Sequence, residues 1–199
     1  MNPRTGFRRN GQTGFSLLEL VVVLAISLVI AGITVPGMVQ TWYNLQLRAS
    51  AGEVADLMQR ARMQAARGNY VVAVRYRVVG GAQQVYTDFN NAGAFNPNNG
   101  ETLLSLARIT AAPNAPGGNP ANYVDTMDTS AGAPCDNTCT LAFSPRGLPC
   151  NLVGGACPTP SPSYFVYYFN DGRPNGWAAV LVSKAGRTRV LMWNGTSWK

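Results

Sequence analysis

The chain has 199 residues, enough for one domain with a hydrophobic core, or for such a domain on a long helical stem. It carries 16 Lys and Arg against 9 Asp and Glu, a formal net charge of +7, and it contains no histidine. The missing histidine excludes a Ser/His/Asp triad, a Cys/His pair and histidine-ligated metal sites. We therefore expect a chain that is not an enzyme and has no cofactor and no metal site.

An apolar segment follows a short basic start. Residues 15–35 carry a single charge, that of Glu19, and a helix of this length crosses roughly 30 Å of hydrocarbon. Residues 1–14 contain no acid, and positive charge before a span keeps that end in the cytoplasm. We expect one membrane span at 15–35. The basic residues before it are Arg4, Arg8 and Arg9.

A secretory signal peptide also has a basic start and an apolar run. Here the run is longer than a usual signal core, and no small-x-small cleavage site directly follows it. Glu19 also stands where such a core is uncharged. These features favour a retained membrane anchor.

The residues from Gly14 to Glu19, GFSLLE, resemble the type IV prepilin motif. The resemblance implies that a prepilin peptidase cuts between Gly14 and Phe15 on the cytoplasmic side and methylates the new N-terminal Phe15. Residues 1–14 would be a leader that is removed, and the mature chain would carry 13 basic against 9 acidic residues, a net charge of +4.

Glu19 supports this interpretation on physical grounds. A carboxylate inside a membrane segment costs several kcal/mol unless it finds a partner or reaches water. In pilins, the resemblance implies, this glutamate pairs with the freed amino group of a neighbouring subunit, which here is that of Phe15. The alternative is a glutamate near the helix end that reaches the interface.

One helix is predicted over residues 15–68, with Gly68-Asn69 as its stop. Pro36, beside Gly37, is expected to weaken or kink it just past the span. Its second half is expected to pack on a sheet, because apolar residues recur near helical spacing. These are Leu47, Val54, Leu57, Met58, Ala61 and Ala65.

Arginines are interspersed along this second half. A basic stripe that binds nucleic acid is one interpretation, but we expect a solvated face. The arginines are Arg48, Arg60, Arg62 and Arg67.

Residues 69–199 are predicted to form a β-rich globular domain, so the fold class is α+β, a long N-terminal helix packed on an antiparallel sheet. Lys184-Ala185-Gly186 predicts the turn of a terminal hairpin, and residues 111–134 an irregular surface loop. Runs rich in β-branched and aromatic residues predict strands over 70–79, 83–89, 102–110, 140–143, 164–170, 177–183 and 187–193.

Four cysteines lie in one loop-rich stretch. An even number suits a disulfide framework if the domain lies outside the cytoplasm, and the three possible connectivities remain open. A four-cysteine zinc site is the alternative, but the spacings do not match paired zinc knuckles. The four are Cys135, Cys139, Cys150 and Cys157.

Two later phrases, FSPRGLP at 143–149 and GRTRV at 186–190, resemble the GspH/FimT family of minor pilins and pseudopilins. The resemblance implies a structural subunit of a type IV pilus or a type II secretion filament. It implies partnership with other pilin or pseudopilin subunits and with the prepilin peptidase. It also implies an inner-membrane anchor with the globular domain in the periplasm or on the assembled filament.

The FimT branch of this family implies DNA binding for uptake. In a strand, Arg187 and Arg189 point to one face, where both can meet phosphates, and Gly186 and Lys184 lie beside them. Residues 172–199 contain no acid and three tryptophans, which suits single-stranded nucleic acid. The alternative is an exposed hairpin with charges for solubility, tryptophans in the core and no DNA binding.

Asp125 and Asp128 form a close carboxylate pair in the predicted loop. An enzyme or a calcium site is a weak interpretation of this pair, and loop polarity explains it as well. The sequence does not decide between pilus and secretion system, and it does not identify the neighbouring subunits.

Overall fold

The computed structural model describes residues 15–106, 109–112, 115–117, 135, 139–158 and 164–199. The predicted leader, with Gly14, and the carboxylate pair Asp125 and Asp128 lie outside these residues. The chain divides into two units, one ending at Trp42 and the other comprising Tyr43–Lys199.

A single helix, α1, comprises Leu17–Gly68. Helical backbone continues through Pro36, so the proline does not end the helix, and a kink there stays a prediction. The helix ends where the sequence predicts, because Asn69 adopts a left-handed backbone with φ of 54°.

The second half of α1 buries one stripe of side chains in the globular unit. Leu47, Val54, Met58 and Ala65 are each at most 2% exposed. Spacings of seven and four residues, which are about two turns and one turn, place them on one face of the helix. The predicted packing of this half on β-structure is therefore confirmed.

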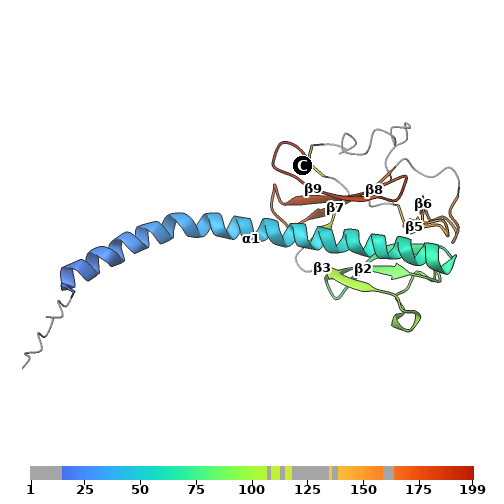
Figure 1. The fold of residues 1–199 in the computed structure, drawn as a ribbon, viewed down its shortest axis with the longest axis horizontal. Coiled ribbons are helices and arrows are strands. Elements are labelled where there is room, and N and C mark those ends of the chain that lie inside the picture. Colours follow the sequence, from blue (N-terminus) through green and yellow to red (C-terminus); the bar gives the residue numbers. More distant parts are fainter. Residues whose placement is uncertain (1–14, 107–108, 113–114, 118–134, 136–138, 159–163) are drawn as a thin grey trace, which may run out of the picture. The chain divides into compact units, whose positions relative to one another are not determined.

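In the described residues, the named strands form two antiparallel sheets. Figure 1 shows the second half of α1 lying along them, and the main core contains side chains from the helix and from both sheets. The first sheet has the order β3-β2-β1-β5-β6, with β1 Val72–Val79, β2 Ala82–Asp88, β3 Leu103–Leu106, β5 Leu141–Phe143 and β6 Pro149–Asn151. The second has the order β4-β7-β8-β9, with β4 Thr110–Ala111, β7 Tyr164–Asn170, β8 Trp177–Ser183 and β9 Thr188–Met192.

The strand prediction over 102–110 is wrong as a single element. Leu103–Leu106 pairs with β2 in the first sheet, whereas Thr110–Ala111 pairs with β7 in the second. The chain passes from one sheet to the other within this run, so one continuous strand is not possible. The sequence also missed β6, which begins with Pro149; it is an edge strand, where proline is tolerated.

Phe143 tests the packing of this core. Its side chain is fully buried among helix and sheet residues, so Phe143→Ala is expected to lower the free energy of unfolding by about 3–5 kcal/mol. The measurement is denaturant unfolding of the Tyr43–Lys199 unit. Leu148→Ala, at a side chain 46% exposed, is the control and should change stability little. Equal losses for the two variants would contradict the placement of Phe143.

Candidate functional site

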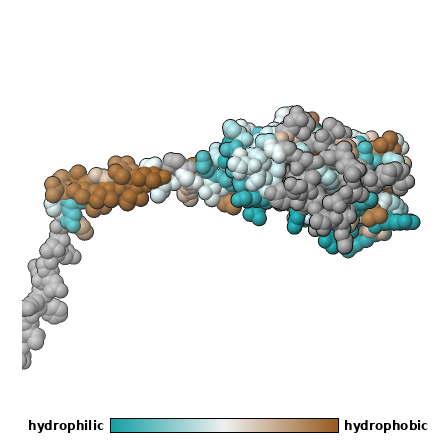
Figure 2. All heavy atoms as spheres, turned by 90° about the horizontal axis from the view of Figure 1, so that it is seen from above, coloured by the Kyte–Doolittle hydropathy of each residue, from teal (hydrophilic) through white to brown (hydrophobic). Residues whose placement is uncertain are grey.

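The first part of α1 exposes its apolar side chains. Leu17, Leu28 and Ile33 are each more than 70% exposed, and Figure 2 shows this segment as an almost continuous apolar surface. Among the described residues, this is the helix that is long and apolar enough to cross a membrane. Such a surface is costly in water and must be covered by lipid or protein.

Glu19 lies in the first turn of the helix, close to the exposed Phe15. The start of a helix carries partial positive charge from unsatisfied N–H groups, which favours a carboxylate there. Its position leaves the carboxylate exposed at the end of the apolar segment.

The four cysteines form two local disulfides, Cys135–Cys139 and Cys150–Cys157. This pairing answers the connectivity that the sequence left open. The zinc alternative is wrong, because each sulfur is bonded to another sulfur. Within the described ranges, no group of His, Cys, Asp or Glu is arranged to hold a metal ion.

The terminal hairpin has the predicted turn. The Gly186 N–H donates to the Ser183 carbonyl at 2.7 Å, and the Ser183 N–H donates to the Arg187 carbonyl at 2.9 Å. Gly186 has a φ of +77°, a backbone conformation that glycine adopts without strain. Lys184 and Ala185 form the exposed tip.

Register places the two hairpin arginines on one face of the second sheet. Arg189 pairs with Leu181, which packs in a cluster on the face away from the main core, and Arg187 is opposite Ser183. The intervening Thr188 accepts a hydrogen bond from Gln59 of α1, so it lies on the helix side. Both arginines are exposed and alternate with Thr188. DNA binding by these residues stays a prediction.

The tryptophans on this face are mainly packed. Trp198 is 3% exposed and lies 5.8 Å from Tyr168 and 5.4 Å from Trp193, measured between ring centroids. Trp198 is therefore a core residue, as one of the two interpretations expected. A buried ring offers no face on which a base can stack.

Arg62 makes contacts that the sequence did not predict. Its Nε donates to the Gly147 carbonyl and its NH1 to the Gly186 carbonyl, each at 3.0 Å. The expectation that Arg62 belongs to a solvated face is wrong, because the side chain is half-buried against two loops. Its position four residues after the buried Met58 and three before the buried Ala65 was the available signal.

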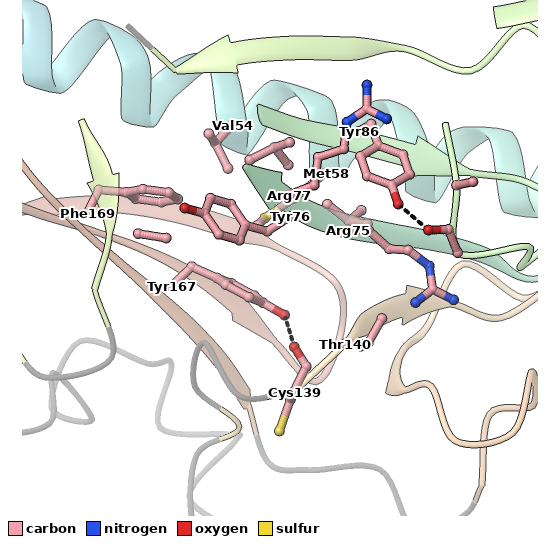
Figure 3. A pocket seen from close by; sticks show the side chains of 15 residues that line it. Val54, Met58, Arg75, Tyr76, Arg77, Tyr86, Cys139, Thr140, Tyr167 and Phe169 are labelled. Atoms are coloured by element: carbon pink, nitrogen blue, oxygen red, sulfur yellow. Dashed lines mark hydrogen bonds between the residues drawn. The ribbon is translucent and has the colours of Figure 1, made fainter. Parts of the chain in front are cut away.

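A cavity of about 650 Å³ lies among α1, β1 and β7, with Val54, Met58 and Tyr167 in its wall (Figure 3). Arg75 at its margin donates to the buried Asp88 carboxylate at 2.6 Å. Among the described residues that line this cavity, no nucleophile is paired with a base.

Tyr86 lies beside the same cavity. Its hydroxyl donates to the Gly93 carbonyl at 2.9 Å, and burial raises the pKa of Tyr86 above its usual value. The phenol therefore stays protonated at neutral pH and serves as a structural donor.

The comparison with known families matches the N-terminal segment. Residues 9–35 match the model described as a prokaryotic N-terminal methylation motif. This chain carries that motif. The motif is typical of type IV pilins and pseudopilins, and implies assembly with other pilin subunits and processing by a prepilin peptidase. Together, the motif and the apolar helix fit a membrane-anchored, single-pass protein.

No curated protein and no solved structure matches the chain. The globular unit therefore has to be interpreted from its own residues.

Removing the Arg62 guanidinium tests its role in the globular unit. Arg62→Met is expected to lower the free energy of unfolding by about 1–3 kcal/mol, because the buried Gly147 loses the donor to its carbonyl. Thermal or denaturant unfolding measures the change. Arg67→Met is the matched control, since Arg67 is exposed on the same helix and should cost little. A loss no larger than that of the control would contradict the assignment.

Proposed function

We propose that this chain is a minor pilin or pseudopilin of the GspH/FimT type, a structural subunit of a type IV pilus or a type II secretion filament. The observation that carries the proposal is the change of environment along α1. The methylation motif leads into a part of the helix that is apolar and exposed, while the part beyond Leu47 is packed in a globular unit.

The N-terminal chemistry follows from the motif. The prepilin peptidase cuts after Gly14, residues 1–14 leave as a leader, and Phe15 becomes the methylated N-terminus. Residues 15–35 then span the inner membrane as part of a helix over 15–68. On assembly, the apolar surface passes from lipid to neighbouring helices, which keeps it out of water throughout.

The globular domain, residues 69–199, lies in the periplasm or on the filament surface in this proposal. Two disulfides support that location, because disulfides persist in oxidising compartments and are rare in the cytoplasm. The basic start before the span supports the same orientation.

Glu19 has the central role in assembly under this proposal. Its carboxylate pairs with the free amino group of Phe15 in the adjacent subunit. An ion pair surrounded by apolar side chains fixes the axial position of one helix against the next, because a displaced subunit leaves a buried charge without a partner.

Replacing Glu19 by glutamine tests this pairing. Glu19→Gln should be processed and inserted in the membrane as the unaltered chain is, but its amount in sheared filaments should fall at least tenfold. Immunoblots of membrane and filament fractions give both amounts. Glu53→Gln, at an exposed position on the same helix, is the control. Incorporation of Glu19→Gln at the normal level would refute the pairing.

A second activity, DNA binding, is favoured by the terminal hairpin. Arg187 and Arg189 are exposed on one face of the second sheet, and Lys184 stands at the tip of the same turn. Guanidinium groups presented together on a rigid strand suit contacts to neighbouring phosphates. The competing function is a purely structural tip subunit of a type II secretion pseudopilus, which needs no charged face.

DNA binding by the Tyr43–Lys199 unit distinguishes these two functions. The unit contains every core residue named above, so it carries its own core. We expect binding that weakens steeply with salt and is reduced in Arg187→Gln and Arg189→Gln, because each substitution removes a phosphate contact. Arg48→Gln removes the same charge from the distant part of α1 and should bind normally. The absence of binding at low salt would leave the structural function alone.

A further inference from the structure

Two turns of the globular unit have the same hydrogen bonds. In residues 144–148, the Gly147 N–H donates to the Ser144 carbonyl at 2.8 Å, and the Ser144 N–H donates to the Leu148 carbonyl at 2.9 Å. In both turns, the N–H that follows the glycine donates to the serine hydroxyl, at 3.3 Å here and 3.2 Å in residues 183–187. The two segments thus form one type of turn, in β5–β6 of one sheet and β8–β9 of the other.

Arg62 joins these two turns. Its planar guanidinium donates to the glycine carbonyl of each, one from Nε and the other from NH1. The two turns and the Arg62 side chain lie close together at Gly186. A Cβ added there would lie 3.1 Å from the Gly147 carbonyl oxygen and 2.9 Å from the Arg62 Nε. Gly147 also has a positive φ, +71°, so both positions require glycine.

The two hydrogen bonds from Arg62 place the turns side by side, and the turns contain cations that are far apart in the sequence. Arg146 is exposed and directly precedes Gly147, while Lys184 and Arg187 are exposed on either side of Gly186. The half-buried Arg62 adds a fourth positive charge behind the two turns. Positive charge on two neighbouring turns raises the local electrostatic potential, which attracts a polyanion.

We propose that the two turns form a single phosphate-binding surface, to which Arg146 contributes beside Lys184 and Arg187. Its ligand is the phosphodiester backbone of DNA, because the exposed groups on the two turns are cations, which pair with phosphates and carry no base readout. The proposal rests on the DNA-binding function above. Arg62 acts as a positioning residue, holding the two turns at a fixed separation from behind.

Salt titration of binding tests the role of Arg146, using the full chain in nonionic detergent and a duplex DNA of arbitrary sequence. Arg146→Gln is expected to weaken binding about tenfold at 0.1 M salt and to reduce the slope of log K against log salt by about 1. Arg187→Gln should weaken binding and reduce the slope to a similar extent. Arg48→Gln is the control, about 21 Å along the helix from Arg62.

The outcomes separate the surface from the function on which it rests. If Arg146→Gln matches Arg48→Gln while Arg187→Gln binds weakly, the two-turn surface is refuted and DNA binding by the hairpin stands. If the unaltered chain shows no salt-dependent binding, the DNA-binding function and the surface both fail.

Arg62→Lys tests positioning. Lysine keeps the charge but lacks the planar fork that reaches both carbonyls. We expect Arg62→Lys to reduce the slope of log K against log salt, measured at a temperature well below the midpoint of thermal unfolding. Adding Arg146→Gln to this variant should reduce the slope no further. A purely stabilising role would lower the midpoint and leave the slope unchanged, and that result would overturn the assignment of Arg62.

Discussion

A single helix has to satisfy two environments, and the rest of the structure depends on that constraint. Its first part is apolar on all sides and exposed, whereas its second part has one buried stripe and a polar remainder. Backbone hydrogen bonds within a helix need no outside partner, so one element can serve in lipid and in a folded domain. One unbroken helix, Leu17–Gly68, therefore contains both the exposed apolar segment and the stripe buried in the globular unit.

In the globular unit, α1 supplies the packing surface that both sheets share. Side chains such as Val54 and Met58 lie in a core that also contains Phe143 from the first sheet and Val180 from the second. Polar contacts also fix the positions of two turns against α1, because Arg62 donates a hydrogen bond to one turn from each sheet. The helix thereby connects two hairpins that belong to different sheets, β5–β6 in the first and β8–β9 in the second.

The sequence predicted the elements whose pattern is local. The stop of α1 and both ends of β7 and β8 were correct, since residue types that favour turns, such as glycine, asparagine, proline and serine, bound an apolar run of the sequence in each case. The split of 102–110 between two sheets was not predictable, because propensity does not specify the partner strand. Four cysteines permit three pairings, and spacing alone does not select Cys135–Cys139.

The role of Arg62 escaped prediction for a related reason. An arginine between apolar positions has the same sequence pattern whether it is solvated or bridges two carbonyls. What distinguishes the cases is the arrival of Gly147 and Gly186 from distant parts of the chain, which is a property of the tertiary fold.

The central claim is that the chain becomes a filament subunit through processing at Gly14. Intact-mass spectrometry of the protein, isolated from membranes of cells that contain a prepilin peptidase, tests this most directly. The account predicts a chain that begins at Phe15 and carries one added methyl group. A mass that retains residues 1–14, or one that lacks the whole apolar segment 15–35, would contradict it.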